Sequence, residues 1–484
     1  MKKTLTILAL ITLATQSFSQ NKTLYRKDFE SGYINKKYTK AQIAQDIEFM
    51  LAVTKKAHVN FYHSFTEIQL KNKVDSILNS LPDSSTIFSA SLAISKIEAL
   101  FNEGHLGLVS NSATEQSFQK STHKFPYYLH SVTDSTLIIY RDLSSASKLM
   151  ANDTIISIND TPAKTFINNF KQYLGGMNTW RLEKIANSFS YLMFASDALP
   201  PYKILVKRDG KLFEHITDGL IRMPSTKAPD NSAAVKEVKK EEKQTNLNYQ
   251  LSIKDNNIGY INFLRMHNYK SFKDSIKTTF QDLAAKNVES LIIDLRDNGG
   301  GDSRLGEHLL SYITNKPFRL EASKKTKISS HWKRRLRLLN NPWFIKLFSY
   351  SIPGGYSSTS KMKVRKRKIA EPFFKGRVVF LIGSGTFSAA NILANGIKDF
   401  KLAPLIGEST AEPSNVYSDM LDFMLPNTKL VARSSMAYYI RANGDPTDFN
   451  GIAPDYLIKP NGEDVKRRRD AVLNFAKQYL KEKR

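Results

Sequence analysis

The stretch Leu291-Ile-Ile-Asp-Leu-Arg-Asp-Asn-Gly-Gly-Gly301 decides the fold of this 484-residue chain. Its first half is a run of aliphatic residues, which is typical of a strand buried on both faces. Its second half ends in three consecutive glycines, which indicate a turn whose main-chain amides can approach a ligand closely. A helical pattern follows at 303–312, so strand, turn and helix come in the order of a crossover unit.

The same order of elements repeats on both sides of this stretch. A strand is expected at Ile258–Phe263 before a helix at 270–286, and another at Arg377–Ile382 before a helix at 388–399. Strands that alternate with helices favour a mostly parallel sheet. Because open sheets of this kind bind ligands at the carboxyl ends of their strands, the glycine run lies where a site is expected.

A serine stands at the same edge, in Gly383-Ser-Gly-Thr-Phe-Ser388 at the start of the last of these helices. Two interpretations are open for Ser388 and the glycines. Ser388 is a nucleophile and nearby amides hold an oxyanion, or Ser388 is a helix cap and the glycines form a tight turn. Neither glycine run has the spacing and the lysine of a phosphate-binding loop, which argues against a nucleotide site.

The composition excludes several classes of chemistry. The chain has no cysteine, so it has no disulfide, no cysteine nucleophile and no lipid-modified N-terminal cysteine. There is no His-Glu-x-x-His sequence either, and we expect neither a metal nor another cofactor.

The charge is strongly positive and unevenly distributed. The formal net charge is +26, and residues 316–378 hold 18 Lys+Arg against two acidic residues. This basic insertion also contains Trp332 and Trp343 among arginines and leucines, which predicts a pair of amphipathic, surface-seeking helices. Anionic lipid or an acidic protein is the expected partner here, or the insertion is a solvated lid with a basic face.

The N-terminus reads as a secretory signal peptide over residues 1–19. Lys2 and Lys3 precede a short apolar core, and Ser17-Phe-Ser19 offers small residues for cleavage before Gln20. An uncleaved anchor is the alternative. We expect an exported protein, periplasmic or extracellular, and therefore no nucleic-acid partner.

Taken as an ordered set, these segments resemble the C-terminal processing (tail-specific) serine peptidases, a group that includes the tricorn core and relatives of interphotoreceptor retinoid-binding protein. The resemblance rests on the stretch ending at Gly301, on Thr386-Phe-Ser-Ala-Ala-Asn-Ile392, on Leu405-Ile-Gly-Glu-Ser-Thr410 and on Gly451-Ile-Ala-Pro-Asp455. It implies an α+β multidomain chain with an N-terminal helical domain, a PDZ-like domain and a catalytic core of the ClpP/crotonase-like βαβ type.

The expected domain boundaries combine this resemblance with changes in sequence character. They are 1–19 signal peptide, 20–118 N-terminal helical domain, 119–223 PDZ-like domain, 224–250 linker, 251–460 peptidase core with the insertion 316–378, and 461–484 C-terminal helix.

The resemblance also implies site residues. Ser388 matches the nucleophile of the family, and Ala389 would supply one oxyanion amide. Gly300 matches the glycine that supplies the second amide, although the alignment within Gly299–Gly301 is ambiguous. Pro413 stands where one branch of the family has an activating lysine, so a Ser-Lys dyad is not expected.

The tricorn-like branch uses a histidine instead, and His105 in Glu103-Gly-His105 matches it. Imidazole titrates near neutrality, so it can take the serine proton and return it to the leaving amine. Asp448 occupies the place of the carboxylate that orients this histidine, with aspartate for glutamate, and Glu412 is a rival for that role.

The resulting expectation is a serine endopeptidase that acts on unfolded or loosely structured polypeptides. One alternative is a catalytically inactive protein that binds polypeptide or another ligand on the same fold. A second alternative is a membrane-surface scaffold that acts through the basic insertion.

Overall fold

The computed structural model describes residues 32–109, 111–221, 248–254, 257–338, 342–460, 462–467 and 469–482. The predicted signal peptide and nearly all of the predicted linker lie outside the described residues. Across the described part, none of the helices combines the length and the apolar composition that crossing a bilayer requires.

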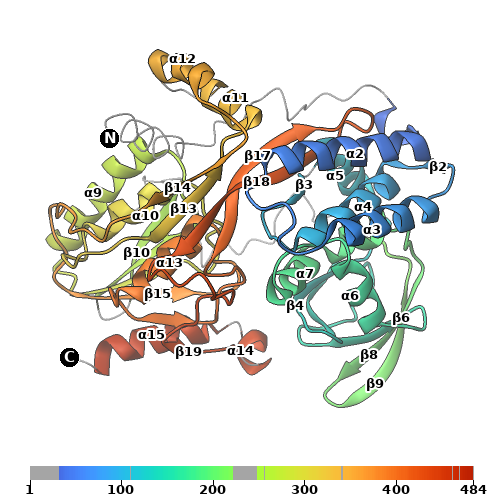
Figure 1. Cartoon of the computed structure of the whole chain (residues 1–484). Coiled ribbons are helices and arrows are strands. Elements are labelled where there is room, and N and C mark those ends of the chain that lie inside the picture. Colours follow the sequence, from blue (N-terminus) through green and yellow to red (C-terminus); the bar gives the residue numbers. More distant parts are fainter. Residues whose placement is uncertain are drawn as a thin grey trace. The chain divides into compact units, whose positions relative to one another are not determined.

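The chain folds into two compact units (Figure 1). The core unit comprises the described residues within Val238–Asp419 and Met436–Arg484, and the N-terminal unit comprises those within Gln20–Glu237 and Met420–Ser435. The boundaries that were expected inside the N-terminal unit stay predictions.

The core unit is built on a six-stranded sheet in the order β10-β11-β12-β15-β16-β19. Its strands are β10 (Tyr249–Lys254), β11 (Ile258–Phe263), β12 (Ser290–Asp294), β15 (Arg377–Ile382), β16 (Leu405–Gly407) and β19 (Tyr456–Leu457). β10 runs antiparallel to β11, and every other pair in the sheet is parallel. The prediction of a mostly parallel sheet is therefore confirmed, with the aliphatic run as its fully buried strand β12.

Helices cover both faces of this sheet. Successive residues of β12 point to opposite sides, so both faces present apolar side chains that the helices bury. Leu291 and Ile293 belong to an apolar cluster with residues of α9, α10 and α13, whereas Ile292 packs with Val472 of α15. The helices are α9 (Tyr269–Ala285), α10 (Ser303–Leu310), α13 (Ala389–Asp399), α14 (Gly462–Lys466) and α15 (Ala471–Glu482). The C-terminal segment thus forms two helices where one was expected.

A second sheet has the order β14-β13-β18-β17. Its strands are β13 (Glu321–Lys327), β14 (Ser357–Lys361), β17 (Val416–Met424) and β18 (Val431–Arg441). The chain passes from the core unit into the N-terminal unit within β17 and comes back within β18. These two long strands, β17 and β18, were not expected from the sequence.

The basic insertion contains the expected helix pair, α11 (Ser330–Leu338) and α12 (Trp343–Ser351), between β13 and β14. Trp332 and Leu336 of α11 are buried, whereas Trp343 of α12 is exposed. The three residues therefore do not cluster together on the surface.

The N-terminal unit begins with helices. They are η1 (Tyr33–Asn35), α2 (Lys40–Ala57), α3 (Glu67–Ser80), α4 (Ile87–Glu98), η2 (Ala99–Phe101), α5 (Ser112–Lys120), α6 (Ala163–Lys171) and α7 (Asn178–Ala195). Thr39 caps α2 through a capping box with Gln42, as its position before the helix predicted. The helix expected over 88–103 ends earlier, at Glu98, and α7 was not predicted.

Six strands of this unit form an antiparallel sheet in the order β4-β5-β6-β8-β9, with β7 paired to β6. They are β4 (Tyr127–Val132), β5 (Leu137–Asp142), β6 (Thr154–Ile158), β7 (Thr161–Pro162), β8 (Tyr202–Arg208) and β9 (Lys211–Thr217). The short strands β1 (Tyr38–Thr39) and β2 (Ser84–Ser85) pair with each other, and β3 covers Gly107–Val109. The hairpin predicted at Asp209-Gly210 joins β8 to β9. β3, just after His105, pairs with β18 at Val431–Arg433.

Candidate active site

Ser388 lies on the turn between β15 and α13, at the carboxyl end of the parallel strands. Its backbone has φ 54° and ψ −124°, and its side chain makes no capping hydrogen bond. A non-glycine residue in this conformation costs on the order of 1–3 kcal/mol and persists only where its surroundings impose it. The helix-cap interpretation of Ser388 therefore fails, and the strained turn points to function.

The neighbouring strand end holds this turn in place. The Thr386 hydroxyl donates to the carbonyl of Leu295 (2.8 Å) and accepts from the amide of Gly383 (3.2 Å). The amide of Phe387 donates to the carbonyl of Asn298 (3.0 Å). The two features that the sequence placed at one sheet edge are thus hydrogen-bonded to each other.

Gly300 is the member of the glycine run that touches the serine turn. It has φ +91°, and a Cβ there would lie 2.7 Å from the amide nitrogen of Ala389 and 2.7 Å from the Cβ of Ser388. A Cβ at Gly299 would meet nothing within 4 Å, and one at Gly301 would meet Met266 instead. Among Gly299, Gly300 and Gly301, Gly300 is therefore the glycine that contacts Ser388 and Ala389.

The two amides assigned to the oxyanion hole have different surroundings. Ala389 is the first residue of α13, where amides precede the intrahelical hydrogen bonds and lie in the positive end of the helix dipole. The Gly300 amide donates to Oδ1 of Asn298 at 2.9 Å. An oxyanion would therefore share the Gly300 amide with Asn298 or replace it.

Glu412 is a buried carboxylate next to Ser388. Its Oε2 accepts a hydrogen bond from the main-chain amide of Ser388 at 2.5 Å. Asn391 fixes the same segment to α13, because its Nδ2 donates to the carbonyl of Pro413 (2.9 Å) and its Oδ1 accepts from Thr410 (2.7 Å). The sequence offered Glu412 only as a rival for the histidine-orienting role, and its link to the Ser388 amide was missed.

Asp448 also belongs to the core unit, but it is engaged elsewhere. Its Oδ2 accepts from the guanidinium of Arg441, and its Oδ1 accepts from the amide of Asn450 at 3.0 Å. Arg441 is held in turn by Asp399, at 2.6 Å. The role of Asp448 as the orienting carboxylate stays a prediction.

His105 is carried by the N-terminal unit, and its pairing with Ser388 stays a prediction. It is buried, with 7% of its surface exposed, and it lines a cavity of about 740 Å³ within that unit. Other lining residues include Phe118, Trp180 and Lys184. His105 therefore stands at the wall of a cavity large enough for several side chains.

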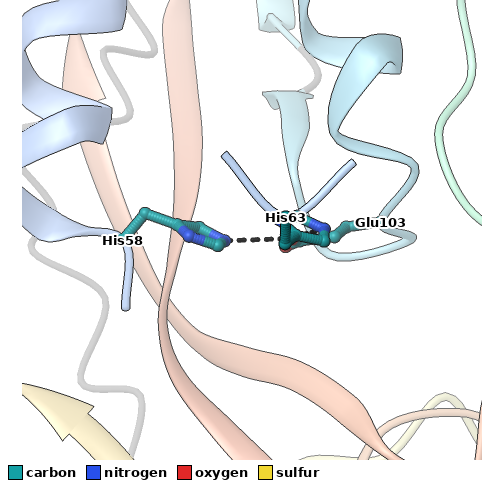
Figure 2. A group of neighbouring side chains, drawn as sticks. All are labelled: His58, His63 and Glu103. Atoms are coloured by element: carbon teal, nitrogen blue, oxygen red, sulfur yellow. Dashed lines mark hydrogen bonds and ion pairs between the residues drawn. The ribbon is translucent and has the colours of Figure 1, made fainter. Parts of the chain in front are cut away.

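A buried network fixes the loop that carries His105 (Figure 2). Glu103 Oε1 lies 2.7 Å from Nε2 of His58 and 3.3 Å from Nε2 of His63, and Glu103 Oε2 accepts from the Ser435 hydroxyl at 2.7 Å. A Cβ on Gly175 would lie 2.5 Å from the Glu103 carbonyl oxygen, so the loop also packs tightly against the segment just before α7. No pattern in the sequence predicts this network, apart from the Glu-Gly-His element itself.

Among the residues that the structure describes, His58, His63 and Glu103 come closest to a metal-ligand set, with ligand atoms within 4.8 Å of one another. However, Nδ1 of His58 accepts from the amide of Asn60 (3.0 Å), so the proton of a neutral His58 lies on Nε2. That Nε2–H donates to Glu103 and is not available as a ligand. The geometry therefore favours a hydrogen-bonded network over a metal centre.

Comparisons with known proteins agree with this core. Residues 257–458 match the model of Peptidase family S41. The fold is similar to that of mature CPAF, at 13% identity and a TM-score of 0.61, over 91% of this chain and 97% of that chain. Mature CPAF complexed with lactacystin matches at 14% identity and a TM-score of 0.60, over 91% and 98%.

A weaker structural match is the photosystem II D1 C-terminal processing protease, at 14% identity and a TM-score of 0.44, over 88% of this chain and 96% of that chain. The family match covers β11 to β19, which is the part of the chain that holds Ser388 and Gly300. The chain is a serine-type peptidase, and residues 257–458 of its core match Peptidase family S41.

Proposed function

We propose that this chain is an exported endopeptidase in which Ser388 is the nucleophile and His105 is the general base. The observation that carries the proposal is the backbone of Ser388, which is held at positive φ against Gly300 with its hydroxyl unused as a cap. Strain at a polar residue on a parallel-sheet edge is common at catalytic sites.

The proposed reaction is acyl transfer in two steps. The Ser388 hydroxyl oxygen attacks the scissile carbonyl carbon while His105 takes its proton, and the amides of Ala389 and Gly300 stabilise the oxyanion. The carbon–nitrogen bond then breaks, and the proton passes from His105 to the leaving amine. Water attacks the acyl-enzyme in the same way and frees Ser388, with Asp448 orienting His105.

Unfolded or loosely structured polypeptide is the proposed substrate. The cavity beside His105 supports this proposal, because its apolar and aromatic walls suit the side chains of an extended chain. Residues 119–223, which contain the β4–β9 sheet, are proposed to be PDZ-like and to capture peptide by strand addition. Export rests on the predicted signal peptide, and N-terminal sequencing of the secreted protein should then begin at Gln20.

Proteolysis of a casein-type substrate tests the assignment of Ser388. Ser388→Ala should abolish hydrolysis without lowering the melting temperature, because the side chain makes no capping bond. Ser384→Ala is the matched control, since Ser384 lies in the same turn and should be dispensable. Full activity in Ser388→Ala would show that the nucleophile is elsewhere.

A catalytically inactive binding protein is the second candidate. The hydrogen bond from the Gly300 amide to Asn298 favours it, because one of the two oxyanion donors is already used. Under this second function the wild-type chain would bind extended peptides but would not cleave them, and Ser388→Ala would bind them with the same affinity.

A further inference from the structure

The helix α12 exposes an apolar face that the described residues of its own unit do not cover. Trp343, Phe344, Leu347 and Tyr350 have exposed fractions of 75%, 55%, 62% and 69%. Trp343, Leu347 and Tyr350 are spaced four and three residues apart, so they share one side of the helix. Soluble proteins rarely expose a contiguous patch of this kind unless it serves an interaction.

The apolar residues of α12 stay exposed although the helix packs against α11. The opposite side of α12 is buried through Ile345 and Ser349, and α12 packs on α11. Arg337 of α11 joins them, since its guanidinium lies 4.5 Å from the ring centre of Tyr350 and donates to the Ser349 hydroxyl at 3.3 Å. Figure 1 shows α11 and α12 standing beyond the ends of β13 and β14. The apolar face is thus held outward by packing on its other side.

Positive charge is concentrated in the insertion that carries this face. Residues 322–370 contain 14 Lys+Arg and no acidic residue. Lys324 and Arg367 form ion pairs with acids elsewhere in the core unit, Asp419 and Glu307, both at 2.6 Å. On the helix pair itself, Arg334 of α11 is exposed and Lys346 of α12 is half-buried.

We propose that α12 docks the protein on an anionic membrane, with its apolar face in the headgroup region and the surrounding lysines and arginines on the phosphates. An acidic protein would satisfy the charge, but it would not account for a tryptophan, a phenylalanine, a leucine and a tyrosine facing outward together. That combination is typical of helices that lie in the membrane interface. At nine residues α12 is far shorter than the ~20 needed to span a bilayer, so it would lie on the surface.

Flotation of the full mature protein with lipid vesicles tests the proposal. We expect binding to vesicles that contain phosphatidylglycerol to be at least tenfold stronger than binding to pure phosphatidylcholine. Trp343→Ser/Leu347→Ser should reduce this binding at least tenfold. The matched control is Leu212→Ser/Ile216→Ser, which removes apolar side chains with exposed fractions of 60% and 69% from β9 and should bind normally.

Charge-reversal variants distinguish docking through the apolar face from binding by electrostatic attraction alone. Arg334→Glu/Lys346→Glu, on the helix pair itself, should weaken binding several-fold, whereas Lys56→Glu/Lys211→Glu, an equal change of charge in the N-terminal unit, should leave it unchanged. If the charge variant loses binding but Trp343→Ser/Leu347→Ser does not, the apolar face does not insert and the proposal is wrong. Binding to polyglutamate with none to vesicles would overturn it in favour of an acidic protein.

Tryptophan fluorescence supplies a readout that does not depend on activity. Anionic vesicles should shift the emission to shorter wavelength, and Trp343→Phe should remove the shift although Trp180 and Trp332 remain. Ser388→Ala should dock like the wild type. Failure of docking would therefore leave the peptidase assignment intact, and failure of the peptidase assignment would leave docking intact.

Discussion

At the scale of single residues, the turn that carries Ser388 depends on contacts that a sequence pattern cannot resolve. The sequence placed Ser388 and a glycine run at one sheet edge, and it left the choice among three glycines open. The structure selects Gly300 because its Cα lies against Ser388 and Ala389. It also adds the hydrogen bond from the Ser388 amide to Glu412, which joins residues 24 positions apart. No local pattern encodes a pairing of that kind.

Gly300→Ala should lower kcat/KM at least a hundredfold. Its Cβ would lie 2.7 Å from the Ala389 amide nitrogen, and alanine is strained at φ +91°. Gly299→Ala is the control, because a Cβ there meets nothing within 4 Å and should change activity less than threefold. Steady-state kinetics on one fluorogenic peptide compares the two, and equal losses would mean that Gly300 has no special place in the site.

Glu412 should act as a positioning residue through the Ser388 amide. Glu412→Gln keeps an oxygen that can accept the hydrogen bond and should retain at least a third of kcat. Glu412→Ala removes the acceptor and should lower kcat roughly 10- to 100-fold, the equivalent of about 1.5–3 kcal/mol for a hydrogen bond to a charged group. KM should change little in both variants. A Glu412→Gln variant as impaired as Glu412→Ala would show that the charge, and not the hydrogen bond, matters.

At the scale of elements, the sequence predicted features that depend on neighbouring residues. It did not predict features that depend on how the elements pack. The capping residue Thr39, the hairpin at Asp209-Gly210 and the aliphatic strand β12 were all predicted correctly, since each depends on neighbours in sequence. The helix α7 was missed, because no capping side chain marks its start at Met177. Trp332 is buried and Trp343 is exposed because of the way α11 and α12 pack. A run of mixed apolar and basic residues does not predict that packing.

Glu98, the last residue of α4, should make the stability of the N-terminal unit depend on pH. Burial raises the pKa of Glu98 well above its ordinary value, so the folded chain binds this proton more tightly than the unfolded chain. The stability from that proton is fully present below the ordinary carboxyl pKa and is lost as the pH rises through the folded pKa. Ionised Glu98 therefore destabilises the N-terminal unit at alkaline pH.

Glu98→Gln should raise the melting temperature of this unit at pH 8 by about 2–4 °C, the shift expected for roughly 1 kcal/mol. The gain should shrink toward pH 5, where the wild-type carboxyl keeps its proton. Glu48→Gln, at an exposed position of α2, is the control and should show no such trend. Calorimetry at both pH values provides the comparison, and a gain that grows toward pH 5 would reverse the assigned sign.

At the scale of the whole molecule, the residues of the proposed mechanism are divided between the two units. The core unit carries Ser388, Ala389 and Gly300, and the N-terminal unit carries His105. The sequence predicted this division of roles only through family resemblance, because the two residues are 283 positions apart. The sequence did not predict that Met420–Ser435 folds with the N-terminal unit, because that segment is continuous with the strands β17 and β18.

His105→Ala should lower kcat about 10²–10⁴-fold, the usual contribution of a general base. His123→Ala, which changes an exposed histidine of the same unit, should have little effect. The rates would be measured on one peptide at saturating substrate. Near-normal turnover in His105→Ala would assign the base to another residue.

The central claim is that Ser388 is an activated nucleophile. Its most direct test is labelling of the mature protein with a fluorophosphonate, followed by mass spectrometry of the tryptic peptides. We predict one phosphonylated serine, Ser388, with labelling lost in Ser388→Ala and retained in Ser384→Ala. A folded wild-type protein that takes up no label, or a Ser388→Ala variant that is labelled as fast as the wild type, would contradict the claim.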